Sequence, residues 1–298
     1  MFVIKHKKWF VGFSILLVVA SLAIIFIKGF KLGIDFQGGT VAELSYPEGT
    51  KIDTITLGEQ LAANGFEGAK VQALGTNKVL VRSTEISEEN RTAFLDEFTI
   101  GEQAPTVERF DTISPSVSKE LKTKSIIALI LVSAFIVCYI AYSFRKVQGT
   151  VSSWYYGLAI VLAIVHDVVI PAAIFAFFGK EVDTLFVVGL LSVVGLSVND
   201  SIVVFDRIRE NLSRANQNEA DTNFQGIVGR SLSQTVVRSL ATSLAVIAVL
   251  ISLVVVGPES TMSLAEVLLI GMIAGTYSSI FFASPALVML SERFSKKK

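Results

Sequence analysis

Charged side chains are scarce in this sequence. Asp, Glu, Lys and Arg make up 17% of the 298 residues, whereas soluble chains carry roughly a quarter. Basic and acidic residues balance at 26 each, so no net field is available to attract nucleic acid. Hydrophobic residues make up 52%, and the mean hydropathy is +0.61. These values indicate that lipid, rather than water, surrounds much of the chain.

Cysteine and histidine are also rare. Cys138 is the only cysteine, and because one cysteine cannot form an internal disulfide, cysteine usage does not indicate a redox compartment. The two histidines have no cysteine or carboxylate partners at the spacing of metal ligands. No Gly-x-x-x-x-Gly-Lys-Ser/Thr loop is present for a nucleotide. The sequence therefore predicts no metal site and no cofactor, and it does not indicate an enzyme.

Long apolar runs dominate what the sequence does contain. The hydrocarbon layer is about 30 Å thick and a helix rises about 1.5 Å per residue, so a span needs about 20 mostly apolar residues. Six segments qualify: Trp9–Ile27, Ile126–Phe144, Trp154–Phe178, Leu185–Phe205, Val236–Val256 and Leu264–Leu290. We therefore predict an α-helical membrane protein with six transmembrane helices. The first apolar run is longer than a signal-peptide core, and we interpret it as an uncleaved anchor.

Lysine and arginine gather in four regions that six spans would place on one side of the membrane. They are Lys5, Lys7 and Lys8; Arg145 and Lys146; Arg207, Arg209, Arg214, Arg230 and Arg238; and Arg293, Lys296, Lys297 and Lys298. The loops on the other side are poorer in basic residues, with Lys180 in one and Glu259 in the other. The positive-inside rule then predicts that both termini are cytoplasmic.

The segment between the first two spans is patterned like a small soluble fold. Strands are predicted at Val41–Tyr46, Lys70–Ala73, Val79–Ser83 and Val107–Ile113, and helices at Ile52–Ala63 and Glu88–Phe98. The order strand–helix–strand–strand–helix–strand is that of a ferredoxin-like α+β domain. Because the segment has no cluster of histidines, cysteines or paired carboxylates, an interaction or rigid-lever role is favoured.

Four parts follow from these patterns. They are a cytoplasmic segment with the first helix (1–27), an extracytoplasmic ferredoxin-like domain (28–125), a five-helix transmembrane bundle (126–290) and a basic cytoplasmic tail (291–298).

Asp200 is an acidic residue inside the fourth predicted span. An ionisable group in hydrocarbon costs about 2.5–3.5 kcal/mol on insertion scales, so it suggests a function. Ser192, Gly195 and Asn199 form a small, polar stripe beside it, which we expect to face other helices. A carboxyl in this setting can take up a proton on one side and release it on the other. The alternative is a static carboxyl that holds the bundle together by hydrogen bonds.

Asp167, in the third span, is a second acidic residue in an apolar segment. It follows His166 and precedes Pro171 by four residues. Function and packing are equally plausible for this pair. Arg238 opens the fifth span and is either a functional partner for Asp200 or an arginine that extends toward the interface.

Gly271 and Gly275 stand four residues apart in the last span. Small residues at this spacing allow two helix backbones to approach closely, so we expect this helix to face protein, either within the chain or in a partner.

Two motifs resemble the SecD/SecF family of the RND superfamily. Gly33-Ile34-Asp35-Phe36-Gln37-Gly38-Gly39-Thr40 is similar to the glycine signature that the family shares. Asn199-Asp200-Ser201-Ile202-Val203-Val204-Phe205-Asp206-Arg207-Ile208-Arg209-Glu210-Asn211 resembles the fourth-span motif of its SecF members. Val165-His166-Asp167 and the Ser233–Leu240 run also match the family pattern. The resemblance covers nearly the whole chain in order.

The resemblance implies an accessory subunit of Sec-dependent protein export in the bacterial inner (plasma) membrane. Its implied partners are a SecD chain, the SecY-containing channel with its SecA-driven preprotein, and membrane lipid. The implied energy source is the proton gradient, or sodium in some organisms. Its implied ion-coupling residues are Asp200, Arg238, Asn199 and Asp167. Two alternatives remain open, namely half of an RND-type exporter of a small molecule or lipid and a passive scaffold for other Sec subunits.

Overall fold

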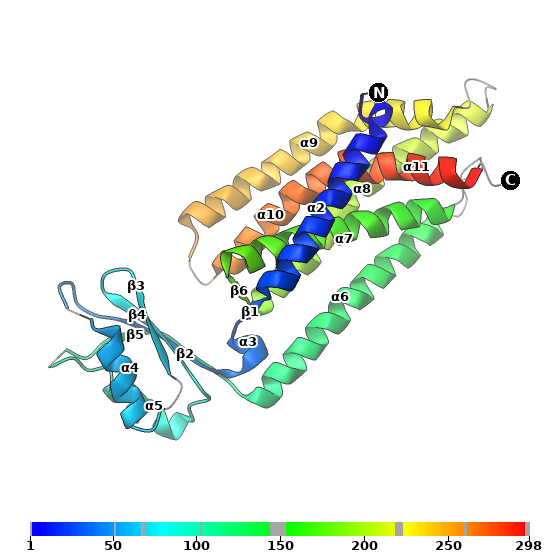
Figure 1. Ribbon diagram of the computed structural model, residues 1–298. Coiled ribbons are helices and arrows are strands. Elements are labelled where there is room, and N and C mark those ends of the chain that lie inside the picture. Colours follow the sequence, from blue (N-terminus) through cyan, green and yellow to red (C-terminus); the bar gives the residue numbers. More distant parts are fainter. Residues whose placement is uncertain are drawn as a thin grey trace. The chain divides into compact units, whose positions relative to one another are not determined.

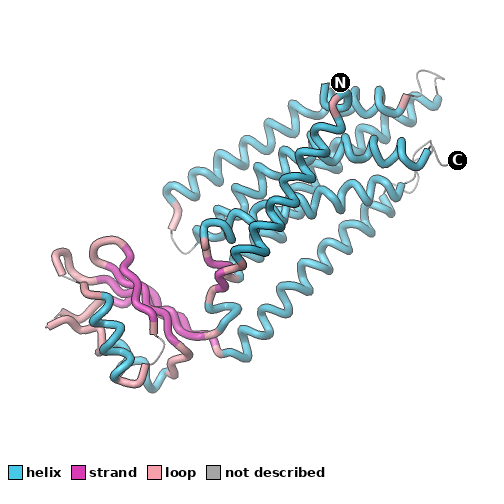
Figure 2. Tube along the Cα trace, in the orientation of Figure 1, coloured by secondary structure: helices cyan, strands magenta, loops and turns pink. Residues whose placement is uncertain are grey.

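The computed structural model describes residues 2–50, 52–66, 69–101, 103–143, 153–217, 223–258 and 261–295. The chain forms two compact units, one of Met1–Lys31 with Ile127–Lys298 and the other of Leu32–Ile126. Figure 1 traces both by colour along the sequence, and Figure 2 separates the helical unit from the unit that contains the sheet.

The larger unit is built from long helices. The short helix α1 (Phe2–Lys5) precedes α2 (Lys7–Lys28), and the later helices are α6 (Pro115–Ser143), α7 (Ser153–Phe178), α8 (Thr184–Gln217), α9 (Phe224–Val256), α10 (Met262–Ser278), the π-helix η2 (Ser279–Ala283) and α11 (Ser284–Ser295). Within the described residues, six helical segments are long and apolar enough to cross a membrane. The predicted six-span architecture is thus confirmed, with η2 and α11 continuing the last span.

Three helices extend well beyond the apolar runs that predicted them, and one of these, α9, begins at Phe224 rather than at Val236. α6 begins at Pro115 rather than at Ile126, because proline is favoured in the first turn of a helix, where its missing N–H is not needed. α8 continues past Phe205 to Gln217. Its polar end is supported by ion pairs at helical spacing, including Arg209 with Asp206 at 2.5 Å.

α7, α8 and α10 form the centre of the membrane unit. More than half of the apolar window is buried in each of these spans, compared with 17% for α2 and α9 and 6% for α6. α8 and α10 approach closely because glycines face larger side chains across the contact. A Cβ atom at Gly271 would lie 2.2 Å from the Val193 side chain, and one at Gly275 would lie 3.0 Å from Ser197. The glycine pair thus packs against α8 of this same chain.

The last span changes its winding at η2. Pro285 has no backbone N–H to donate to the preceding turn, and the wider π-turn lies directly before it. The Ser284 hydroxyl donates to the Ser279 carbonyl oxygen at 3.4 Å, which supports this turn. Single π-turns within helices often occur at functional sites, and this one follows Ser278 directly.

The smaller unit contains a four-stranded antiparallel sheet. Its elements after the short helix α3 (Ile34–Gln37) are β2 (Gly39–Ser45), α4 (Thr54–Ala63), β3 (Lys70–Leu74), β4 (Lys78–Ser83), α5 (Glu88–Asp96) and β5 (Thr106–Ile113). The sheet order is β3-β4-β2-β5. The predicted element order and the ferredoxin-like arrangement are confirmed. Elsewhere in the chain, two further short strands are β1 (Lys31–Leu32) and β6 (Glu181–Val182).

The core of the smaller unit lies between its helices and the sheet. Leu44, Leu61, Val81 and Phe94 are among its fully buried side chains. The Tyr46 hydroxyl donates to the Phe98 carbonyl oxygen at 2.8 Å, and burial raises the pKa of Tyr46 to about 12. The ring therefore stays protonated throughout the physiological range and retains this hydrogen bond.

α4 begins at Thr54, two residues after the predicted start. The Asp53 carboxylate caps the helix by accepting from the Ile55 backbone N–H at 3.0 Å and from the Thr56 hydroxyl at 2.8 Å. The Thr56 hydroxyl and these backbone donors lower the pKa of Asp53. An Asp at this position fixes the first turn because its side chain satisfies otherwise free N–H groups.

Candidate functional site

Asp167 joins three helices at the centre of the membrane unit. Its side chain is completely buried and lies on α7 beside His166. One carboxylate oxygen lies 2.8 Å from His166 Nδ1. The other oxygen accepts from the Ser278 hydroxyl of α10 at 2.8 Å and from the Ser197 hydroxyl of α8. A carboxylate with three donors from three helices is well satisfied, which suits a structural role.

His166 is held in one orientation by this contact. The ring is stacked with Tyr277, with centroids 5.9 Å apart, and tilted against Phe282 at 5.5 Å. Nε2 is buried and has no hydrogen-bond partner among the described residues.

Asp200 lies one helical turn beyond Ser197 on α8. Its side chain is 7% exposed, and it accepts a hydrogen bond of 2.9 Å from the Ser243 hydroxyl of α9. Within the described chain this is the one hydrogen bond to its carboxyl. A carboxylate offers about four acceptor positions, so Asp200 has spare capacity. Asp200 differs from Asp167 in this respect. A carboxyl with unused acceptor positions can bind a proton or another cation without losing its existing hydrogen-bond partner.

Arg238 does not contact Asp200. It is exposed on α9, and no ion pair of Arg238 is formed with any described residue. Arg238 and Ser243 are five residues apart, which rotates them by about 140° around the helix axis. Since Ser243 faces Asp200, Arg238 points to a different side of α9. The pairing considered from the sequence is absent in this arrangement.

Asn199 lies outside the packed core. It is exposed and lines a shallow groove of about 180 Å³ between α8 and α6, together with Gly195 and residues that include Phe135 and Tyr139. No atom lies within 4 Å of a Cβ built at Gly195. Gly195 and Asn199 of the predicted stripe thus face α6 across this groove without packing closely against it. The surface of α8 that contacts α10 is a different one, formed by Val193 and Ser197.

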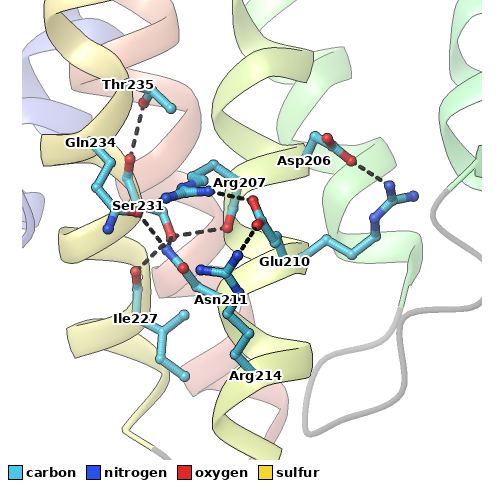
Figure 3. A network of polar contacts seen from close by, with 10 residues as sticks. Asp206, Arg207, Glu210, Asn211, Arg214, Ile227, Ser231, Gln234 and Thr235 are labelled. Atoms are coloured by element: carbon cyan, nitrogen blue, oxygen red, sulfur yellow. Dashed lines mark hydrogen bonds and ion pairs between the residues drawn. The ribbon is translucent and has the colours of Figure 1, made fainter.

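A polar network lies where α8 and α9 approach the loop between them (Figure 3). Asn211 donates to the Ser231 hydroxyl at 2.8 Å and to the Gln234 side-chain oxygen at 2.9 Å, and Arg207 donates to the same Gln234 oxygen at 2.7 Å. Glu210 pairs with Arg207 and, at 2.6 Å, with Arg214. These contacts hold α8 and α9 together beyond their apolar segments.

The other basic regions are held partly by ion pairs. Lys7 of α2 pairs with Glu292 of α11, which also accepts from Gln225 of α9. Lys180, from the predicted loops on the opposite side of the membrane, pairs with Glu266. Arg145, Lys146, Glu259, Lys296, Lys297 and Lys298 lie outside the described residues, as does the Arg293 side chain.

The glycine motif forms a turn within the smaller unit. Gly33 precedes α3, Phe36 is buried in it, and Asp35 is partly buried. Gly38 and Gly39 have φ angles of +79° and +117°, which L side chains rarely adopt. A Cβ at Gly39 would lie 2.5 Å from the Ser83 carbonyl oxygen. The motif thus lets β2 start directly against β4, in agreement with a turn between helix and strand.

Several hydrogen-bond partners of the two aspartates could not be identified from the sequence. Ser197, Ser243 and Ser278 are common residues in apolar helices, and their spacing does not show which helix they face. Among the described residues, no group of three or more His, Cys, Asp or Glu side chains is placed to hold a metal ion.

Comparisons with known proteins agree on one family. Residues 96–293 match the family model described as protein export membrane protein SecD/SecF, C-terminal, and residues 23–46 match the SecD/SecF GG motif. Protein translocase subunit SecF of Thermobaculum terrenum is 37% identical over 96% of this chain and 92% of its own length. The same subunit of Anaerolinea thermophila is 33% identical over 96% and 93%.

The fold is similar to that of solved SecDF structures. The crystal structure of SecDF from Thermus thermophilus, described as a translocon-associated membrane protein, matches with a TM-score of 0.82 and 30% identity. SecDF in a super-membrane-facing form matches with a TM-score of 0.70. These matches cover 97% and 99% of this chain but only 38% and 39% of the SecDF chains.

Proposed function

The chain belongs to the SecD/SecF family of protein-export membrane proteins, and from this premise we propose that it is a non-enzymatic subunit that couples an ion gradient to Sec-dependent protein export. Asp200 carries the proposal, because it is a carboxyl inside a membrane span with a single hydrogen-bond donor and unused acceptor capacity. A charge that crosses 100 mV releases about 2.3 kcal/mol. A few such transfers supply enough energy to bias a domain rearrangement.

The proposed partner is a SecD-like chain. The solved SecDF chains are more than twice as long as the part that this chain matches, so we propose that a second chain supplies the counterpart. α6 and α9 are suited to meet it or lipid, because large apolar side chains such as Phe135, Leu244 and Val249 are exposed on them. The SecY-containing channel and its SecA-driven preprotein are the further proposed partners.

We expect this chain to restore export in cells that lack their own SecF-type subunit. The measurement is the rate at which a secreted precursor is matured, with and without collapse of the ion gradient. Co-purification in mild detergent tests the partner, with the expected outcome that a SecD-like chain stays bound. Normal membrane levels without any restored export, in cells that also express the cognate SecD, would contradict the proposed function.

The proposed topology places both termini and the α8–α9 loop in the cytoplasm and the smaller unit outside. In a Cys138→Ser background, we expect single cysteines at Glu88 and Ser213, both exposed, to be labelled from opposite sides of the membrane. An impermeant thiol reagent added to intact cells should modify Glu88→Cys only. Modification of both positions from outside would contradict the six-span orientation.

A further inference from the structure

Four buried hydroxyl groups follow one another along α9. Ser231, Thr235, Ser239 and Ser243 are 0%, 7%, 3% and 0% exposed. Their four-residue spacing turns each one by about 40° from the one before, so neighbouring hydroxyls lie above one another in a row that winds slowly around the helix. From first to last they rise about 18 Å along the axis. We call these four residues the hydroxyl ladder. One end carries the hydrogen bond to Asp200, and the other lies in the polar network near the α8–α9 loop.

The two ends of the hydroxyl ladder are connected differently from its middle. The Ser231 hydroxyl accepts a hydrogen bond from Asn211 (Figure 3). The hydroxyls of Ser231 and Thr235 also each donate to a backbone carbonyl oxygen one turn earlier in α9. Ser243 donates to Asp200. The Ser239 hydroxyl between them is buried and has no partner among the described residues. Ser201, next to Asp200 on α8, also has a buried hydroxyl without a partner in this part of the chain.

Ser239 marks the ladder as more than a row of small packing residues. Serine and threonine in an apolar helix usually bond back to the carbonyl four residues earlier, yet Ser239 makes no such bond. Leaving a buried hydroxyl unsatisfied is unfavourable. Side chains four residues apart on a helix are about 5–6 Å apart at Cβ, and two consecutive O–H···O bonds of about 2.8 Å bridge such a gap. A water molecule placed between successive hydroxyls would therefore lie within hydrogen-bond distance of both.

We propose that the hydroxyl ladder lines a chain of water molecules that carries protons between the α8–α9 loop and Asp200. The inference rests on the proposed coupling role of Asp200 and assigns its route of access. Each hydroxyl can donate and accept at once, so a proton passes by breaking an O–H bond on one oxygen as another forms on the next, until the carboxyl is protonated. Release reverses these steps.

The ladder suits protons better than a metal ion. A path for metal ions surrounds the ion with several oxygens at each level, whereas the ladder provides one neutral hydroxyl per turn. No carboxylate other than Asp200 is hydrogen-bonded to a ladder side chain in the described residues. Between Ser231 and Ser243 the ladder itself offers a sodium ion only two side-chain oxygens, those of Thr235 and Ser239.

Thiol labelling tests whether water reaches the ladder. In a Cys138→Ser background with the full chain in its native membrane and its partner present, Thr235→Cys and Ser239→Cys are compared with two controls on α9. Leu250→Cys is buried in an apolar setting, and Thr242→Cys is exposed on the outer side of the helix. A small charged thiosulfonate added from the α8–α9 loop side should modify both ladder cysteines at least tenfold faster than either control. Equal rates at Ser239→Cys and Leu250→Cys would overturn the water chain.

A functional measurement separates this proposal from the role of Asp200. The double variant Thr235→Val/Ser239→Ala should slow gradient-dependent export several-fold and increase its rate ratio between H₂O and D₂O. The single variant Thr235→Ser keeps a hydroxyl and should export faster than the double variant, and the control Thr242→Val, outside the ladder, should export at the wild-type rate. If Asp200→Asn abolishes export while the double variant keeps the wild-type rate and isotope ratio, the ladder is wrong and the coupling role stands. If Asp200→Asn exports normally, the coupling role is wrong, and with it the proton route that ends there.

Discussion

Replacing Asp200 by Asn is expected to abolish gradient-dependent export while the protein remains folded in the membrane. The amide has nearly the same shape as the carboxyl and can still accept the 2.9 Å hydrogen bond from the Ser243 hydroxyl. It cannot change charge, so it forfeits the roughly 2.3 kcal/mol per 100 mV that a transferred charge supplies. We expect at least a tenfold fall in the export rate of a secreted precursor, with unchanged protein levels in the membrane.

Conservative variants set the limits of this expectation. Asp200→Glu keeps a titratable carboxyl but moves it by one methylene, so partial activity is expected. Arg238→Lys should have a mild effect, because Arg238 is exposed and forms no ion pair with the described residues. Full export by Asp200→Asn, measured with the gradient intact and with a SecD-like chain bound, would contradict the coupling role. A passive scaffold predicts that outcome.

The sequence was sufficient to predict the six spans and the ferredoxin-like order because both depend on local patterns. About 20 apolar residues specify a span, and alternation or helical periodicity specifies the elements of the smaller unit. The ends of some helices differ from the predicted ends where local interactions other than the apolar pattern set them. α6 starts early at Pro115, and α4 starts late because Asp53 caps it.

The partners within the site depend on which helix faces meet, and one sequence does not encode this locally. Arg238 was a plausible partner for Asp200 by depth, but the rotation between Arg238 and Ser243 selects the serine. Likewise, Gly271 fixes the contact surface of α8 at Val193. That contact leaves the small, polar stripe at Asn199 exposed. The depth of a residue along its helix was therefore predictable from the sequence, whereas the direction in which that residue faces around the helix axis was not.

The second large effect is expected at Asp167, and it is a loss of stability rather than of coupling. Asp167→Ala removes the acceptor for His166 Nδ1 and for the Ser197 and Ser278 hydroxyls. Ser278 retains the Gly275 carbonyl oxygen at 3.2 Å as an acceptor, but His166 and Ser197 lose theirs. Each unsatisfied buried donor costs about 1–3 kcal/mol. We therefore expect a marked fall in the amount of folded protein and in its apparent melting temperature in detergent.

Asp167→Asn separates the structural role from a coupling role at the same position. The amide keeps one acceptor oxygen at nearly the same place, so it should recover part of the lost stability, and the recovered protein should export with gradient dependence. A coupling carboxyl predicts the reverse, because Asp167→Asn would then fold normally and fail to export, as proposed for Asp200→Asn. Measuring the melting temperature and the export rate on the same membranes shows whether each variant loses stability, as a structural residue predicts, or loses export alone, as a coupling residue predicts. Asp167 has three hydrogen-bond contacts from three helices, whereas Asp200 has a single donor. This difference is the physical reason for expecting the two aspartates to differ.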